Sequence, residues 1–393
     1  MRFMAIKKGL LAIAISLLTI SIFTSIHEVA ANEDDIMVGA YYYIWWGIPF
    51  NPHWNESIKY TPFLGKYNSS DPLTAERHII WAKQHGIDFF AISWMGEGRW
   101  LNWDFDDIDY NLKVFLSAKH LENFNFCIFY ETVIVLNTSL NEGKNFTEIF
   151  INDMTYAAEN YFVHPSYLKI NRKPVVFIYN IPYLYNRLGT EKAQSLLGWL
   201  KSEFDIYLVG DVGEGPSPES LSSDWLYALD AVTNYFFSNP SKRWHQILED
   251  AKNYYPLWHS SMNPNGIRFI PNVYPGFNNT GLRNVSNPVV LPANASAFRE
   301  MLNIAMNNTD KELKMLMITS WNEWLDGTAI EPSLEFGETF LHIILEIVPE
   351  LPSIITLLFV ISTTIAIAYY KVNIKKIFRS WRARRDLNPR PPG

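Results

Sequence analysis

The chain has 393 residues, of which 48% are hydrophobic, so it is long enough to bury one large core or two ordinary ones. Its formal net charge of −7 argues against nucleic acid as the main partner. The single cysteine, Cys127, excludes an internal disulfide framework and a cysteine-based zinc site.

The N-terminal segment has the order of charged and apolar residues that is typical of a secretory signal. Arg2, Lys7 and Lys8 precede an apolar run over residues 10–26, and small residues and then acidic ones follow it. This order predicts a signal peptide or an uncleaved anchor over residues 1–33.

Between residues 34 and 345, short β-rich runs alternate with longer helical patterns. We expect eight strands, which begin at Met37, Gly86, Phe124, Pro174, Asp205, Leu229, Ile267 and Lys314. Most of these runs are almost continuously apolar, as parallel strands that are buried on both faces are. Helices are predicted from Pro72, with Asp71 as the N-cap, and from Thr190.

Eight β/α units in about 300 residues predict an α/β fold, a (β/α)8 TIM barrel that covers residues 34–345. An open doubly wound sheet is the alternative. It is disfavoured because no glycine-rich phosphate-binding turn follows the first strand.

The C-terminal part reads as a membrane anchor. Residues 351–370 form an uncharged apolar run that is about long enough to cross a bilayer, so we expect a transmembrane helix there. The basic segment 371–393 is then a cytoplasmic tail by the positive-inside rule, which places the preceding domain outside the cell membrane. An excess of N-x-S/T sequons favours a glycosylated exterior domain; they begin at Asn55, Asn68, Asn137, Asn145, Asn278, Asn284, Asn294 and Asn307.

The C-terminal ends of the predicted strands carry the candidate binding residues, and TIM-barrel active sites lie at that face. These ends are rich in aromatic rings and in hydroxyl, amide and carboxylate groups. The candidates are Tyr42, Tyr43, His53, Trp54, Trp94, Glu131, Tyr235, Tyr274, Asn322, Trp324 and Glu331. Flat apolar faces beside polar groups suit sugar rings, so we expect an oligosaccharide or polysaccharide substrate. A large aromatic core is the alternative explanation of the aromatic content of 15%.

The segment SWNEWLDGTAIEP, residues 320–332, carries the strongest catalytic signal. It places Glu323 and Asp326 three positions apart, among tryptophans, directly after an apolar run. Buried carboxylates are usually paired or used, and two of them suffice for glycoside hydrolysis. Glu131 and Asp211 are the other acids at strand ends, although an isolated Asp such as Asp211 is more often a turn residue.

Other kinds of chemistry have less support in the sequence. No G-x-S-x-G nucleophile elbow is present. No cluster of His, Asp and Glu shows a metal-ligand spacing, so we expect neither a metal nor a cofactor. Cys127 lies inside a predicted strand, where a buried apolar thiol is the simpler interpretation.

These motifs resemble the family 99 glycoside hydrolases, the endo-α-mannosidase family, and related proteins from bacterial polysaccharide gene clusters. The resemblance covers residues 37–343 and rests on several segments in order, among them GAYYYIWWG, GIDFFAISWMG, FYE, PNVYPGFNNT and ITSWNEWLDGTAIEP. It implies a TIM barrel that cleaves α-mannosidic linkages with retention, through participation of the sugar 2-hydroxyl. It also implies that Glu323 is the base for that hydroxyl, that Asp326 is the acid, and that Glu131 binds the reacting sugar.

One position departs from the family pattern. The second acid is usually Glu, as in NEWxEGT, and here it is Asp326. Asp has the shorter reach, and a misplacement of about 1 Å can cost on the order of 10²-fold in rate. Three interpretations follow. A backbone shift compensates for the shorter side chain, another acid takes the role of proton donor, or the protein has lost hydrolysis and only binds glycans.

The sequence therefore predicts a membrane-anchored exterior glycoside hydrolase. The alternatives are a glycan-binding ectodomain without catalysis and a transglycosylase of surface polysaccharide assembly.

Overall fold

The computed structural model describes residues 36–47, 54, 58–98, 108–213, 215, 217–281 and 287–348. The predicted signal or anchor, the predicted transmembrane helix, the predicted tail and His53 lie outside these residues. Among the residues that are described, no helix is both long and apolar enough to cross a membrane.

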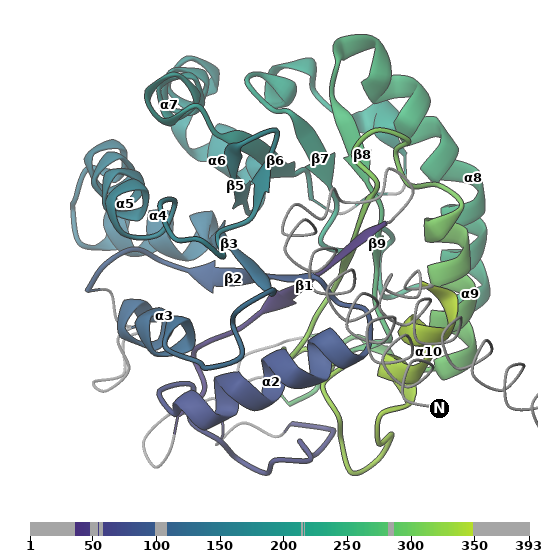
Figure 1. Ribbon diagram of the computed structural model, residues 1–393. Coiled ribbons are helices and arrows are strands. Elements are labelled where there is room, and N and C mark those ends of the chain that lie inside the picture. Colours follow the sequence, from purple (N-terminus) through teal and green to yellow (C-terminus); the bar gives the residue numbers. More distant parts are fainter. Residues whose placement is uncertain are drawn as a thin grey trace, which may run out of the picture. The chain divides into compact units, whose positions relative to one another are not determined.

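A parallel sheet that nearly closes into a barrel forms the centre of the domain (Figure 1). Its strand order is β8-β7-β6-β5-β3-β2-β1-β12-β9. The strands are β1 (Met37–Tyr42), β2 (Phe89–Trp94), β3 (Asn125–Tyr130), β5 (Lys173–Ile178), β6 (Tyr207–Asp211), β7 (Ala231–Thr233), β8 (Arg268–Ile270), β9 (Asn272–Val273) and β12 (Met315–Ile318). Each overlaps one of the eight predicted runs, so the prediction of a TIM barrel is confirmed.

Strands β8 and β9 are two parts of the seventh predicted strand, and Pro271 separates them. β8 pairs with β7, and β9 pairs with β12. Proline has no amide hydrogen to donate to a β-ladder, but the Pro271 carbonyl accepts the amide of Met317. The two parts together therefore connect β7 with β12 and complete the ring.

Helices surround this barrel (Figure 1). They are α2 (Pro72–Gln84), α3 (Ile108–Leu116), α4 (Thr132–Asn141), α5 (Phe146–Asn160), α6 (Ile181–Leu188), α7 (Thr190–Phe204), α8 (Trp244–Met262), α9 (Ala295–Met306) and α10 (Thr339–Ile347). The Asp71 side chain accepts the amide of Leu73 at the start of α2, as the sequence predicted. Gly86, with φ of +73°, follows the end of that helix.

Short elements complete the described part of the domain. Strand β4 (Lys169–Ile170) lies antiparallel to β5, and β10 (Phe277–Asn278) pairs with β11 (Val290–Leu291) outside the barrel. Three short 3₁₀ helices also occur: η2 (Pro218–Ser220), η3 (Ser223–Leu226) and η4 (Asn263–Asn265).

The core fills the barrel and the space between barrel and helices. All residues of β2 and β12 are buried, as expected for strands covered on both faces. Aromatic rings from β1 and β3, the two neighbours of β2, meet in this core, where the ring centroids of Tyr41 and Phe129 lie 4.6 Å apart. Gly39 leaves room for the ring of Phe89, because a Cβ at position 39 would lie 2.1 Å from Phe89 Cζ. Cys127 is buried in β3, in agreement with the sequence analysis.

Candidate active site

The loop that follows β12 is held in shape by its own small side chains. Ser320 Oγ accepts the amide of Glu323 at 2.8 Å and lies 2.9 Å from the Thr328 hydroxyl. Gly327 has φ of +62°, and a Cβ there would approach Asn278 to 3.2 Å. The backbone around the two predicted catalytic acids is therefore fixed by serine, threonine and glycine at three defined positions.

Asn322 connects this loop to the end of β1. Its Oδ1 accepts the amide of Tyr43 at 2.7 Å, and its Nδ2 donates to the Tyr43 carbonyl at 2.9 Å. The amide of Trp321 donates to the Tyr41 carbonyl nearby. Asn322 is fully buried, so it positions the loop in this structure, and its contact with substrate stays a prediction.

Glu323 is buried, and only one of its two carboxyl oxygens accepts a hydrogen bond from the part of the chain that the structure describes. Its Oε1 accepts the amide of Leu325 at 2.9 Å, whereas its Oε2 has no hydrogen-bond partner among the described residues. Burial raises the pKa of Glu323 well above its usual range, and the neighbouring carboxyls of Asp326 and Glu131 raise it further. Burial also raises the pKa of Asp326, to about 6. The carboxyl oxygen Oε2 thus keeps an unused capacity for one more hydrogen bond.

Glu131 belongs to the same electrostatic cluster, although it comes from the end of β3. The Ser93 hydroxyl at the end of β2 donates to Glu131 Oε1 at 2.8 Å. Burial, with a smaller contribution from the charge of Asp211, raises the pKa of Glu131 to about 7, although the hydrogen bond from Ser93 acts in the opposite direction. The sequence analysis did not single out Ser93 as a site residue. Its place at a strand end was the only available signal.

Tyr43 and Tyr235 form a pair beside these carboxyls. Their hydroxyl oxygens are 2.6 Å apart. Burial raises the pKa of both phenols; the Tyr43 pKa also responds to Glu131 and Glu323, and the Tyr235 pKa to Asp326 and Glu323. One of the two hydroxyl protons is used in the hydrogen bond between the tyrosines, so the other remains available to a third group. The pair can therefore donate to a sugar oxygen.

Glu331 lies in a buried network behind the loop. Its Oε2 accepts the Tyr67 hydroxyl at 2.7 Å and the Trp324 indole N–H at 3.2 Å. Its Oε1 lies 3.1 Å from Nε2 of His78, whose Nδ1 lies 3.0 Å from the Tyr42 hydroxyl. Tyr42, Trp324 and Glu331 thus contact buried protein groups, and their contacts with substrate stay predictions. The sequence analysis missed Tyr67 and His78, because neither lies in a strand-end motif.

Three more predicted binding residues are buried and hydrogen-bonded to the protein. The indole of Trp54 donates to the Tyr67 carbonyl, that of Trp94 to Asp109, and the Tyr274 hydroxyl to the Ser238 carbonyl. At these positions the aromatic side chains build the core and its satellite cluster, which was the alternative explanation of the aromatic content.

Asp211 accepts three backbone amides at the end of β6, those of Asn180, Gly213 and Tyr235. These bonds show that Asp211 stabilises the turn after β6, which the sequence analysis gave as the more common role of an isolated Asp at a strand end. The structure therefore groups Glu131, Glu323 and Asp326 as the candidate acids, whereas Asp211 holds the backbone at the end of β6.

Comparisons with known proteins show the family of the chain. A family model described as Glycosyltransferase WbsX matches residues 50–344. The chain belongs to this family.

Several relatives of this WbsX-family chain carry mannosidase names. The human "Glycoprotein endo-alpha-1,2-mannosidase-like protein" is 22% identical over 362 residues, which cover 80% of this chain and 72% of the relative. The rat "Glycoprotein endo-alpha-1,2-mannosidase" is 23% identical, with 74% and 64% covered. The "Uncharacterized protein WxcX" of Xanthomonas campestris is 22% identical, with 52% and 31% covered.

Solved structures show the same fold. A "Glycoside hydrolase-like protein" superposes with a TM-score of 0.62 at 19% identity, over 81% of this chain and 95% of that one. The GH99 endo-alpha-mannosidase from Bacteroides thetaiotaomicron gives a TM-score of 0.55 at 19% identity, over 76% and 88%. The resemblance to the endo-α-mannosidase superfamily is thereby confirmed.

Proposed function

We propose that this WbsX-family protein is a glycoside hydrolase that acts on α-mannosidic or similar linkages. The observation that carries the proposal is the group of three buried carboxyls, Glu131, Glu323 and Asp326, beside a pair of tyrosine hydroxyls. Burial raises the pKa of all three carboxyls, to about 7 for Glu131 and about 6 for Asp326, and a glycosidase requires one carboxyl that stays protonated. The mannosidase names of the relatives support the choice of mannose.

Glu323 and Asp326 act as base and acid in the proposed reaction. Two neighbouring buried carboxyls do not both ionise readily, so the working form of the pair carries one proton. Burial and the charge of Asp326 favour that proton on Glu323 in the free protein, so the proposal requires bound substrate to shift it to Asp326. Glu323 takes the proton of the sugar 2-hydroxyl while that oxygen attacks C1 and the bond from C1 to the leaving oxygen breaks. Asp326 gives its proton to the leaving oxygen.

The second half of the proposed reaction reverses these roles. Asp326, now a carboxylate, takes a proton from water as the water oxygen attacks C1 of the 1,2-anhydro sugar. The bond from C1 to the 2-oxygen breaks, and Glu323 returns its proton to that oxygen. Two inversions at C1 give net retention. This chemistry follows the resemblance, and the unpartnered Glu323 Oε2 supports it, because that atom is available to the 2-hydroxyl.

Asp326 serves as the acid in this proposal despite its shorter side chain. The Asp326 carbonyl accepts the amide of Asn278 at 2.7 Å, which ties the backbone at the acid to β10. Burial raises its pKa to about 6, which keeps a protonated fraction near neutral pH. Glu131 and the pair Tyr43 and Tyr235 then hold the reacting sugar.

A transfer reaction is the second candidate, and the description of the WbsX family as a glycosyltransferase favours it. The same residues perform it when a sugar hydroxyl replaces water in the second step. The test is to incubate the full chain with α-mannan and manno-oligosaccharides, with and without an acceptor oligosaccharide, and to size the products. Shorter products with new reducing ends support hydrolysis, and longer products support transfer. Binding without any product would leave the glycan-binding ectodomain as the function.

We also propose that the domain faces the exterior of a cell membrane, with an anchor at residues 351–370. The signal pattern of residues 1–33 and the basic segment 371–393 support this location. Protease added to intact cells should then remove the domain and leave the basic tail protected. Full protection of residues 40–340 would contradict the location.

A further inference from the structure

A cluster of two histidines and one glutamate lies outside the barrel, where the end of α2 meets α10. Its members are His85, Glu338 and His342, whose ligand atoms all lie within 4.8 Å of one another. His85 Nε2 is 3.6 Å from Glu338 Oε2, and His342 Nε2 is 3.8 Å from Glu338 Oε2. The sequence analysis expected no metal cluster, because His85 is far from the other two in the chain.

The two separations from Glu338 are close to those of a tetrahedral metal centre. Bonds of about 2.0–2.2 Å from a zinc ion to nitrogen or oxygen place two tetrahedral ligand atoms about 3.3–3.5 Å apart. The two distances to Glu338 exceed this by a few tenths of an ångström, and the third separation, between the two histidines, is at most 4.8 Å, so binding requires the exposed imidazole of His342 to rotate toward His85. We propose that His85, Glu338 and His342 bind one divalent transition-metal ion of the zinc type. Two imidazoles favour such ions over Mg²⁺ or Ca²⁺, which prefer all-oxygen sites.

His85 is oriented for this role by its own helix. Its Nδ1 lies 2.7 Å from the Trp81 carbonyl. A carbonyl oxygen only accepts, so Nδ1 donates to it, and Nε2 is the ring nitrogen that faces Glu338 and would bind the ion. The His85 side chain is only 7% exposed, so its surroundings hold the ring in place. A metal site gains affinity when a ligand is held in this way.

Glu338 and His342 present their side chains on one face of α10. Glu338 is the N-cap of this helix, and the amide of His342 donates to the Glu338 carbonyl one turn earlier. Their side chains are 42% and 59% exposed, so the fourth position of a tetrahedral ion is open to water.

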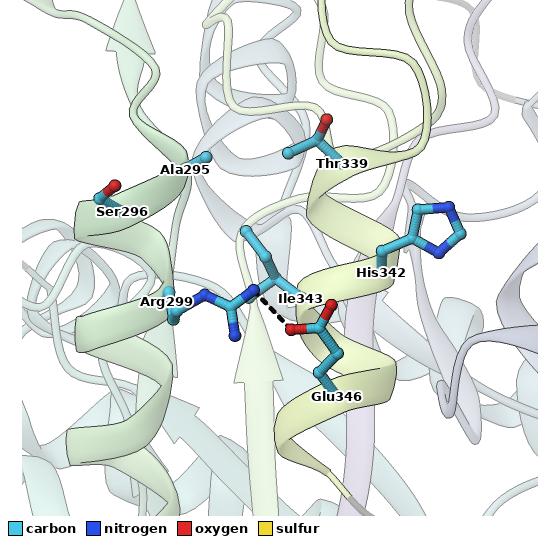
Figure 2. A pocket seen from close by; sticks show the side chains of 7 residues that line it. All are labelled: Ala295, Ser296, Arg299, Thr339, His342, Ile343 and Glu346. Atoms are coloured by element: carbon cyan, nitrogen blue, oxygen red, sulfur yellow. Dashed lines mark hydrogen bonds and ion pairs between the residues drawn. The ribbon is translucent and has the colours of Figure 1, made fainter.

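His342 also borders the neighbouring groove between α9 and α10, but the ion pair of that groove is made by other residues. It encloses about 270 Å³ and is lined in part by Arg299 and Glu346, which form an ion pair across it (Figure 2). Figure 2 shows the imidazole of His342 turned away from Arg299. On α10, Glu346 therefore pairs with Arg299 of α9, whereas Glu338 and His342 lie in the cluster with His85.

A bound ion would connect α2 and α10, the helices that follow β1 and β12, which are adjacent strands of the barrel. An ion that binds the folded chain and not the unfolded one raises the melting temperature. For a domain of this size we expect a rise of about 5 °C at a metal concentration about 100 times the dissociation constant. This inference does not depend on the proposed hydrolase activity.

The test uses the full chain without an added histidine tag, after treatment with a chelator. Zn²⁺ is titrated by calorimetry, Co²⁺ by its visible absorption, and melting is followed with and without Zn²⁺. We expect one saturable site per chain, a tetrahedral Co²⁺ spectrum and a higher melting temperature. His342→Ala, which removes an exposed ligand, should lower the affinity at least 10-fold and abolish the melting shift.

His120→Ala is the matched control. His120 Nδ1 lies 2.7 Å from Glu76 Oε1 on the surface, so it is a histidine–glutamate pair of similar exposure that is not in the cluster. It should leave binding unchanged. Glu338→Gln provides a second ligand variant, and it should also weaken binding. Absence of a saturable site in the wild type, or equal affinity in His342→Ala and His120→Ala, would overturn the proposal.

Discussion

The hydroxyl oxygens of Tyr43 and Tyr235 are 2.6 Å apart, and the charges of Glu131, Glu323 and Asp326 act on one or the other of them. One residue follows β1 and the other follows β7, so closure of the barrel brings them together. Because burial keeps both phenols protonated, the pair offers one proton beside three carboxyls. This relationship is a property of the closed ring, and it gives the first prediction.

The Tyr43 and Tyr235 hydroxyls should contribute to turnover as one unit. Tyr43→Phe and Tyr235→Phe should each lower kcat/KM by about 10- to 100-fold, as expected for the loss of one hydrogen bond to substrate or transition state. The double variant should lose little more than either single variant, because the shared bond is already broken. Tyr185→Phe, whose hydroxyl has no partner among the described residues, is the control and should keep full activity.

Glu323→Gln should abolish most turnover and keep binding. The amide preserves shape but cannot take the proton of the 2-hydroxyl, and general-base catalysis is worth roughly 10²–10⁴-fold. Steady-state kinetics with manno-oligosaccharides and calorimetric binding of the same sugars separate the two effects. A fully active Glu323→Gln protein would show that the acids of the loop after β12 are structural.

Asp326→Asn should lose activity selectively. A fluoride or aryl glycoside has a leaving group that needs little protonation, so its hydrolysis should be partly spared, while that of a mannobioside should fall by about 10²-fold or more. Asp326→Glu restores the usual family residue and should keep or raise the rate. Equal losses on both substrate types would argue against Asp326 as the acid.

Glu131 should make the domain less stable as the pH rises. Its pKa is raised from an ordinary 4.5 to about 7, so the folded state binds the proton more tightly than the unfolded state. The associated stability is complete below pH 4.5 and is lost as the pH rises through 7. Glu131→Gln removes this penalty and should gain about 3 kcal/mol relative to wild type at pH 8, and little at pH 4.

Urea unfolding of both proteins at pH 4, 6 and 8 measures this difference. Glu159→Gln changes an exposed acid on α5 and serves as the control, with no pH-dependent gain expected. A constant difference between Glu131→Gln and wild type across this range would contradict the assignment. A gain in stability with a loss of activity would identify Glu131 as a group held at an energetic cost for its function.

Gly39→Ala should destabilise the barrel, because the new methyl group meets the ring of Phe89 on the neighbouring strand. We expect a cost of about 1–3 kcal/mol in the free energy of unfolding, as for other overpacked cores. The second change Phe89→Leu removes the ring atoms and should recover part of that cost, so the two effects should be non-additive. Urea unfolding of the two single variants and the double variant tests this, and additive losses would contradict the contact.

The sequence by itself determined the order of the β/α units and the position of the acid-bearing loop after β12. Eight apolar runs, the Asp71 cap of α2 and the segment from Ser320 to Glu331 depend on local periodicity, capping and turn chemistry, which are encoded in neighbouring residues. Only the tertiary structure decided which acids meet, that Ser93 donates to Glu131, and that Tyr67 and His78 support Glu331. These contacts join residues from distant strands, and the raised pKa values follow from a burial that exists only after the ring has closed.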